Sequence, residues 1–337
     1  MEVKPSQAIS MITTLLKARL VPIMCGSPGI GKSQLYQQVA DFFNLLLIDV
    51  RLGQCDVTDL NGFPTIVGKK ASYVPMDTFP IEGDAIPAGY SGWLILFDEI
   101  TSAVPALQAA AYKVLLDRKI GQHKLHKNVA VCAAGNLETD NAVVEPMSTA
   151  LQSRMVHLEL VVDHKEWIDW ANTHDINHKI TSYINFTPGK LYTFNADHTD
   201  KTYACPRTWE FASRILNTAD EGSKDLLPLL AGALSEGVAR EFLGFCRIYE
   251  SLPTLAQIVL SPDTIKVPGE PSILFALTGS IAHNANMDNF TQLMKFVERL
   301  PVEFQVVCLR ESVRRNPTLK AHPAVLAWIR KSAAELF

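Results

Sequence analysis

Residues 26–33 carry the strongest chemical signal in the chain. They read Gly-Ser-Pro-Gly-Ile-Gly-Lys-Ser and fit G-x-x-x-x-G-K-[ST], the pattern of a phosphate-binding loop. Glycines let backbone N–H groups converge on a phosphate, and a helix directly after the loop adds the positive end of its dipole. We expect Lys32 to reach the β- and γ-phosphates of a nucleotide and Ser33 to bind Mg²⁺. A plain glycine turn before a helix is the alternative. The predicted nucleotide contacts are Gly26, Ser27, Pro28, Gly29, Ile30, Gly31, Lys32, Ser33 and Leu35.

A pair of acidic residues ends the apolar run at residues 93–97. A buried strand delivers its last residues to the carboxyl edge of a parallel sheet, where ligands bind in open α/β sheets. Asp98 is suited to hold Mg²⁺ there, and Glu99 to orient and deprotonate a water that attacks the γ-phosphate. The alternative is an acidic turn after a strand, which the presence of the phosphate loop disfavours.

Two further polar residues stand next to apolar runs. Asn136 follows the run at residues 129–134, and its amide could hydrogen-bond the attacking water or the γ-phosphate. On its own, Asn136 is better explained as a turn residue. Arg154 directly precedes the alternating run at residues 155–160, and taken alone it is an ordinary surface charge.

These residues need a scaffold of strands and helices, which the apolar pattern supplies. Helical spacing of apolar residues begins near Ser6, the expected N-cap, and ends at residue 17. Residues 34–43 and 102–117 also have helical periodicity. The predicted buried strands are residues 21–24, 45–50, 93–99, 129–134 and 155–160.

Two segments between these elements are irregular or strongly charged. Residues 51–92 are rich in Pro, Gly, Asp and Asn, with one predicted hairpin arm at residues 69–74. So long an insertion is usually functional or mobile, and we expect it to contact a partner or face a pore. Residues 118–127 carry dense basic and histidine side chains. They are either a hairpin that grips an acidic or nucleic substrate or a solvated turn, and we favour the turn.

The chain after residue 162 has no further apolar runs typical of sheet strands. Helical patterns cover residues 224–247, 271–285, 287–300 and 324–336. Another helix is predicted from residue 205 onward, with Pro206 near its start.

Composition is that of a folded globular protein. The 337 residues are 47% hydrophobic and 20% charged, with a net charge of −4, which argues against a generic nucleic-acid-coating protein. The six cysteines form no C-x-x-C pair, so we expect neither a zinc site nor a disulfide framework, and a reducing cytosol fits best. No signal peptide or membrane span is visible in the sequence.

The order of these motifs resembles that of the AAA+ ATPases. The Pro-Arg-Thr-Trp at residues 206–209 and the stretch 56–64 are most similar to the MoxR branch, including its viral and prophage members. The resemblance covers about residues 1–250. It implies ATP and Mg²⁺ as ligands and an α/β fold: an αβα sandwich with a parallel five-stranded sheet in residues 1–162. A helical lid in residues 163–250 would follow, and residues 251–337 would form an accessory helical region outside the shared part.

The same resemblance implies roles for three residues. Asn136 would be the sensor that positions water, and Arg154 the arginine finger that reaches a neighbouring subunit's site. Arg207 would be a second sensor that touches the γ-phosphate from the lid. An arginine supplied by a neighbour implies a ring, expected to be a hexamer. Relatives of this kind act in the cytoplasm, or in a host's cytoplasm when viral, and commonly remodel or load proteins with von Willebrand A domains.

Two other functions are compatible with the sequence. One is a nucleotide-gated scaffold, in which ATP only drives assembly with little turnover. The other is a DNA-acting loader or motor, whose support is limited to the basic residues 118–127. The presence of Glu99 and Arg154 favours an active ATPase over a scaffold with little turnover.

Overall fold

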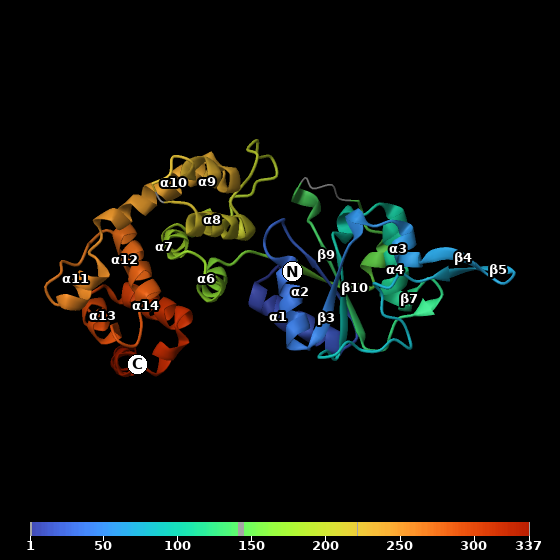
Figure 1. Ribbon diagram of the computed structural model, residues 1–337, viewed down its shortest axis with the longest axis horizontal. Coiled ribbons are helices and arrows are strands. Elements are labelled where there is room, and N and C mark those ends of the chain that lie inside the picture. Colours follow the sequence, from blue (N-terminus) through green and yellow to red (C-terminus); the bar gives the residue numbers. More distant parts are fainter. Residues whose placement is uncertain (1, 141–144, 221, 337) are drawn as a thin grey trace. The chain divides into compact units, whose positions relative to one another are not determined.

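The computed structural model describes residues 2–140, 145–220 and 222–336 (Figure 1). The chain forms two compact units, and each is described by itself. The first unit consists of Met1–Asp163 and Asn195–Asp197, and the second of His164–Phe194 and His198–Phe337.

A parallel sheet of six strands forms the centre of the first unit. Its order is β1-β10-β2-β9-β6-β3, and every neighbouring pair is parallel. The predicted parallel sheet is confirmed, but the predicted number of five strands is wrong. Glu2 and Val3 add a sixth strand beside β10, and a strand of two residues has no periodicity to read. The strands are β1 (Glu2–Val3), β2 (Val21–Cys25), β3 (Leu45–Arg51), β6 (Gly92–Asp98), β9 (Val129–Gly135) and β10 (Met155–Leu160).

Helices cover both faces of this sheet (Figure 1). The first-unit helices are α1 (Pro5–Lys17), α2 (Lys32–Phe42), α3 (Val57–Asn61), α4 (Pro105–Asp117) and α5 (Thr149–Gln152). α1 and α2 lie on one face, and α3 and α4 on the other, where Ala111 packs against Ile95 and Phe97 in a fully buried core. Ser6 is not the N-cap of α1 as predicted. Lys4 holds that position, because Pro5 occupies the first helical turn, where proline needs no N–H partner.

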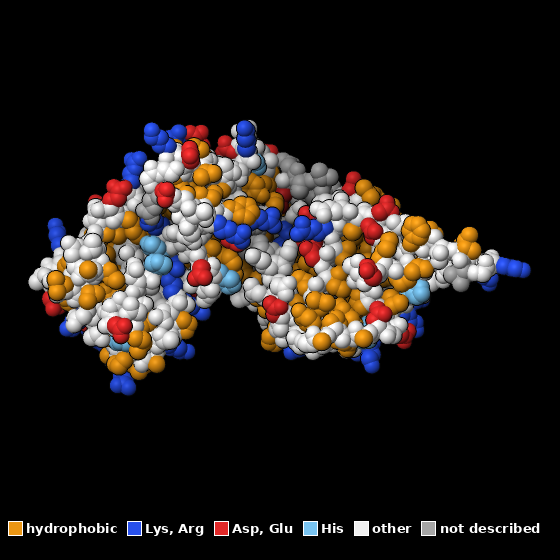
Figure 2. Space-filling model, viewed as in Figure 1, with side chains coloured by type: hydrophobic (Ala, Val, Ile, Leu, Met, Phe, Trp, Pro, Cys, Tyr) orange, Lys and Arg blue, Asp and Glu red, His pale blue; other side chains and the backbone are white. Residues whose placement is uncertain are grey.

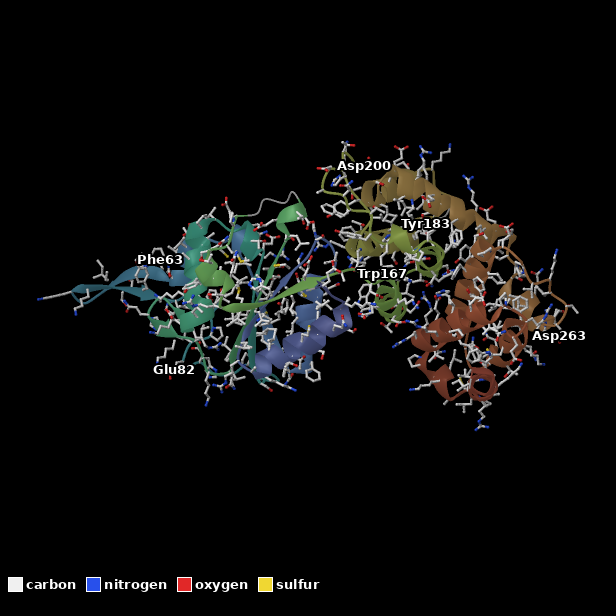
Figure 3. All side chains as sticks on the ribbon, turned by 180° about the vertical axis from the view of Figure 1, so that it is seen from behind. Phe63, Glu82, Trp167, Tyr183, Asp200 and Asp263 are labelled. Carbon is white, nitrogen blue, oxygen red and sulfur yellow. The ribbon has the colours of Figure 1, made fainter. Side chains whose placement is uncertain are left out.

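The predicted insertion contains more regular structure than its composition indicated. Within residues 51–92 lie a 3₁₀ turn, η1 (Leu52–Gln54), the helix α3, and an antiparallel hairpin of β4 (Phe63–Val67) and β5 (Lys70–Val74). The predicted hairpin arm is therefore confirmed. The hairpin projects from the rest of the first unit (Figure 1) and has basic side chains at its tip (Figure 2). Phe63 at its base is 62% exposed (Figure 3).

The basic segment at residues 118–127 forms a second small hairpin. Lys119–Ile120 (β7) pairs with His123–Lys124 (β8) in antiparallel fashion. Arg118 donates to the Val129 carbonyl oxygen, and the His126 ring packs edge-on against Trp93. These contacts anchor the hairpin to the sheet. The alternative of a hairpin fits this geometry, and its binding of a substrate stays a prediction.

All the regular elements that the structure describes in the second unit are helices. The predicted helices at residues 271–285 and 324–336 match α12 and α15. The predicted helix at residues 224–247 is instead two helices, α9 and α10, because the chain is interrupted at Ser235, which has φ of 76°. The pattern missed α7, α11 and α14. The helices are α6 (His164–Thr173), α7 (His178–Phe186), α8 (Pro206–Thr218), α9 (Leu226–Leu234), α10 (Glu236–Cys246), α11 (Leu255–Leu260), α12 (Pro271–Asn284), α13 (Phe290–Val297), α14 (Val302–Arg315) and α15 (Pro323–Leu336).

The predicted lid and accessory regions lie within this one unit. Tyr183 (Figure 3) packs with Trp209 and Phe242 in the core of the lid region. Asp169 on α6 pairs with Arg310 on α14, across the predicted boundary at residue 250. Separate roles for the two regions stay a prediction. Among the described helices, none combines the length and the hydropathy that a bilayer span requires.

Candidate active site

The predicted phosphate loop follows β2 and leads directly into α2. Gly29 and Gly31 have φ of 79° and 95°, a left-handed conformation that favours glycine. At Gly26 an added Cβ would lie 2.8 Å from the Leu160 carbonyl oxygen, so the backbone passes too close for any side chain. Gly31 is the N-cap of α2 and has no side chain to cap the first amides of the helix. The loop therefore has the backbone shape and the open helix N-terminus that suit a phosphate.

The ammonium group of Lys32 lies at the centre of this loop. It donates to the carbonyl oxygens of Gly26 and Ser27, at 2.5 and 3.0 Å. It also donates to the amide oxygen of Asn136 at 3.0 Å. Asn136 directly follows β9, which lies beside β2 in the sheet. Two predicted site residues that follow neighbouring strands thus meet at one edge.

Asp98 joins the same site through the first helical turn of α2. The Ser33 hydroxyl donates to Asp98 Oδ2 at 2.8 Å. The backbone N–H of Glu99 donates to Asp98 Oδ1 at 2.9 Å, so both carboxylate oxygens are held. The carboxylate is therefore fixed next to the hydroxyl with which it was predicted to share a metal ion.

Glu99 has an uncommon backbone conformation. Its φ of 57° and ψ of 31° lie in the left-handed region, which costs energy for a residue with a side chain. Its carboxylate points toward Gly53, where an added Cβ would lie 3.2 Å from Glu99 Oε2. Gly53 thus leaves space for the proposed base. Sequence reasoning missed Gly53, because an isolated glycine in a turn-rich segment gives no signal of what it faces.

Thr101 is a second residue that sequence reasoning missed. Its hydroxyl accepts the backbone N–H of Asn136 at 2.9 Å and is buried. A Cβ added at Gly135 would lie 2.6 Å from Thr101 Cγ2, so this glycine is what allows the close approach. Thr101 therefore fixes the start of the Asn136 segment. No local pattern marks it, because its partner is distant in sequence.

The negative charge near Asp98 suits a cation. Burial, and after it the nearby Asp98 carboxylate, raise the pKa of Asp49 above its usual range. Among the described residues there is no group of three or more His, Cys, Asp or Glu side chains that could hold a metal. Mg²⁺ does not need one, since it commonly binds one or two protein oxygens together with phosphates and water. The hydroxyl of Ser33 and the carboxylate of Asp98 carry hard oxygen atoms that suit such a site.

Arg154 is not brought to this site. It precedes β10 at Met155, which pairs with Val21 at the amino end of β2, whereas the loop follows the carboxyl end of β2. Arg154 therefore lies at the opposite edge of the sheet. It is exposed, and its guanidinium carbon lies 5.3 Å from the centre of the Tyr112 ring.

Two other predicted residues have less direct placements. Arg207 lies in the first turn of α8 in the second unit and is exposed. Leu35 lies in the first turns of α2, but its side chain is only 7% exposed and faces the core. Both stay predictions as nucleotide contacts.

Comparisons with known proteins give only distant likenesses. No protein-family model matches the chain, and no curated protein matches it. A RuvB mutant from Thermotoga maritima aligns with a TM-score of 0.40 and 14% identity, over 86% of this chain and 84% of that one. A Cytophaga hutchinsonii protein described as a candidate ATPase aligns with a TM-score of 0.36 and 14% identity, over 93% and 84%. RuvB described as a Holliday junction branch migration motor, also from Thermotoga maritima, aligns at 0.35 and 15%, over 86% and 84%. Likenesses this weak do not establish a family.

Proposed function

We propose that this chain is an ATPase of the AAA+ type that binds ATP with Mg²⁺ and hydrolyses it. One observation carries the proposal: at one sheet edge, beside a glycine-shaped loop, Lys32 bonds to Asn136, and its neighbour Ser33 bonds to Asp98. Lysine, a hydroxyl, a carboxylate and an amide are the groups that phosphoryl transfer uses to position charge. A plain glycine turn would not require this convergence.

Each residue has a defined task in the proposed reaction. The loop amides and Lys32 bind the phosphates, and Asn136 orients the attacking water. Glu99 accepts a proton from that water as its oxygen bonds to the γ-phosphorus. The bond from the γ-phosphorus to the bridging oxygen breaks, and ADP leaves with that oxygen. Ser33 and Asp98 would hold Mg²⁺, which would neutralise charge on the phosphates.

The proposal extends to a ring of identical subunits. Because Arg154 lies at the far edge of its own sheet, it could reach a γ-phosphate only in another copy. A subunit that donates Arg154 to its neighbour and receives one in return fits a closed ring, and we propose a hexamer. We assign Arg207 as the second positive group, and we propose a MoxR-like role in which hydrolysis remodels a protein client, such as one with a von Willebrand A domain.

ATP turnover measured over a range of protein concentrations tests this proposal. Wild type should hydrolyse ATP, and turnover per subunit should rise with concentration as subunits assemble. Asp98→Asn should abolish Mg²⁺-dependent turnover, whereas Asp117→Asn, at an exposed position at the end of α4, should not. Turnover absent at every concentration would favour a nucleotide-gated scaffold instead. Turnover that Asp98→Asn leaves unchanged would refute the assigned site.

A further inference from the structure

A carboxylate that the proposed reaction does not use lies against the phosphate loop. The Ser27 hydroxyl donates to Asp140 Oδ1 at 3.2 Å, although 113 residues separate the two. Asp140 ends a 3₁₀ turn, η3 (Glu138–Asp140), shortly after Asn136. Its other oxygen, Oδ2, is buried and has no hydrogen-bond partner in the described parts of the chain. A carboxylate side chain therefore stands beside the predicted phosphate loop.

Hydrogen bonds link this charge, through Ser27, to the lysine of the loop. The Ser27 carbonyl oxygen accepts from the Lys32 ammonium, while the Ser27 hydroxyl donates to Asp140. The lysine of such a loop reaches the β- and γ-phosphates. Ser27 thus connects the group that binds the last phosphates with the carboxylate of Asp140.

We propose that Asp140 is a positioning residue that holds Ser27 and sets how strongly the loop prefers ATP over ADP. This inference rests on the proposed function. Like charges repel, and screening is weak for partly buried groups. ATP carries one more negative charge than ADP, and that charge lies on the terminal phosphate. The Asp140 carboxylate therefore weakens the binding of ATP more than that of ADP.

Dissociation constants for ATP and ADP, measured on the full chain with Mg²⁺, test the inference. Asp140→Asn keeps an oxygen that can accept from Ser27 but removes the charge. It should raise the preference for ATP over ADP roughly fivefold, and added salt should reduce this shift. Asp140→Ser, also neutral, should shift the preference in the same direction. Ser27→Ala keeps the carboxylate and should not raise the preference for ATP.

Glu138→Gln is the matched control, because it removes an equal charge from an exposed position on the same turn. It should leave the preference unchanged. The inference is overturned if the preference for ATP over ADP is unchanged in both Asp140 variants. Equal changes in the two affinities would then show a purely structural role for Asp140, and unchanged affinities would show no role. If wild type bound neither nucleotide, the proposed function itself would fail, and the two failures are thus distinguishable.

Discussion

The Lys32 ammonium donates a hydrogen bond to the Asn136 amide oxygen at 3.0 Å across 104 residues of sequence. The sheet order makes this possible, because β9 lies between β2 and β6 and ends at the same edge. The same edge receives Asp98 from β6, which accepts from Ser33. The residues proposed to bind the terminal phosphate and to orient the water are therefore neighbours in the fold.

Glu99→Gln should separate binding from hydrolysis. Glutamine cannot accept the proton of the attacking water, so turnover should fall by about 10²–10⁴-fold while ATP affinity stays near that of wild type. Steady-state phosphate release and equilibrium ATP binding are the two measurements. Glu82→Gln, at an exposed position in the first unit (Figure 3), is the control and should hydrolyse normally. Wild-type turnover in Glu99→Gln would remove Glu99 as the base.

Arg154→Ala should stop hydrolysis without weakening ATP binding in its own subunit. Its position at the opposite sheet edge predicts that it acts on a neighbour. A mixture of Arg154→Ala and Glu99→Gln subunits should regain activity, because some interfaces then combine an intact Glu99 with an intact Arg154. Each variant alone should stay inactive. Failure of the mixture to recover any turnover would count against action between subunits.

Glu311→Gln should stabilise the protein at alkaline pH relative to wild type. Glu311 is buried on α14, and burial raises its pKa to about 7. The positive charge of Arg315, a hydrogen bond from Asn185 and the positive charge of Arg310 lower the pKa, and the Asp169 carboxylate raises it. Below the unfolded pKa of 4.5 the carboxyl is protonated in both states, and its contribution to stability is fully present. Between pH 4.5 and about 7 it ionises in the unfolded state alone, so this stability is lost as the pH rises through that range. Glutamine has no such loss. The advantage of the variant should grow by up to about 3 kcal/mol between pH 4.5 and pH 8.

Unfolding in denaturant at several pH values measures this difference. His178, whose pKa burial lowers to about 3, titrates in both proteins, so its contribution cancels. Glu303→Gln is the control, because Glu303 is exposed on the same helix. A stability difference between Glu311→Gln and wild type that does not change with pH would mean that Glu311 is not held in a costly buried state.

Gly279→Ala should destabilise the second unit. Gly279 lies where α12 crosses α7, and an added Cβ would overlap Ser182 Oγ and lie 3.2 Å from Ser182 Cβ. Overpacking of this kind costs about 1–3 kcal/mol. Ser182→Ala in the same chain should recover part of the loss, because it removes the overlapping oxygen. Thermal unfolding of the single and double variants measures the coupling. If the losses of stability in the two single variants simply added in the double variant, the strain would not lie between Gly279 and Ser182.

The sequence was sufficient to predict the phosphate loop and the five longer sheet strands. Their signals are local: a fixed spacing of glycine, lysine and serine, and unbroken apolar runs such as residues 93–97. Acidic residues at the end of such a run reach the sheet edge whatever the rest of the chain does. That is why Asp98 and Glu99 could be placed at the sheet edge before the fold was known.

Other features depend on contacts between distant segments, so no local pattern marks them. Gly53 is informative only because it faces Glu99, and Thr101 only because it accepts from the backbone of Asn136. Asp140 looks like any acid in a turn until its bond to Ser27 is known. The break at Ser235 was missed because the apolar pattern continues through it, while the backbone turns there with positive φ.

Equilibrium binding of ATP to Lys32→Ala tests the central claim most directly. The account predicts that loss of the ammonium weakens ATP binding roughly 10- to 100-fold or more, because a charge-assisted contact to the phosphates disappears. Lys69→Ala, which removes an exposed lysine in the turn of the β4–β5 hairpin, should bind ATP like wild type. If Lys32→Ala, folded as judged by its thermal unfolding, bound ATP as tightly as wild type, the loop after β2 would not be the nucleotide site.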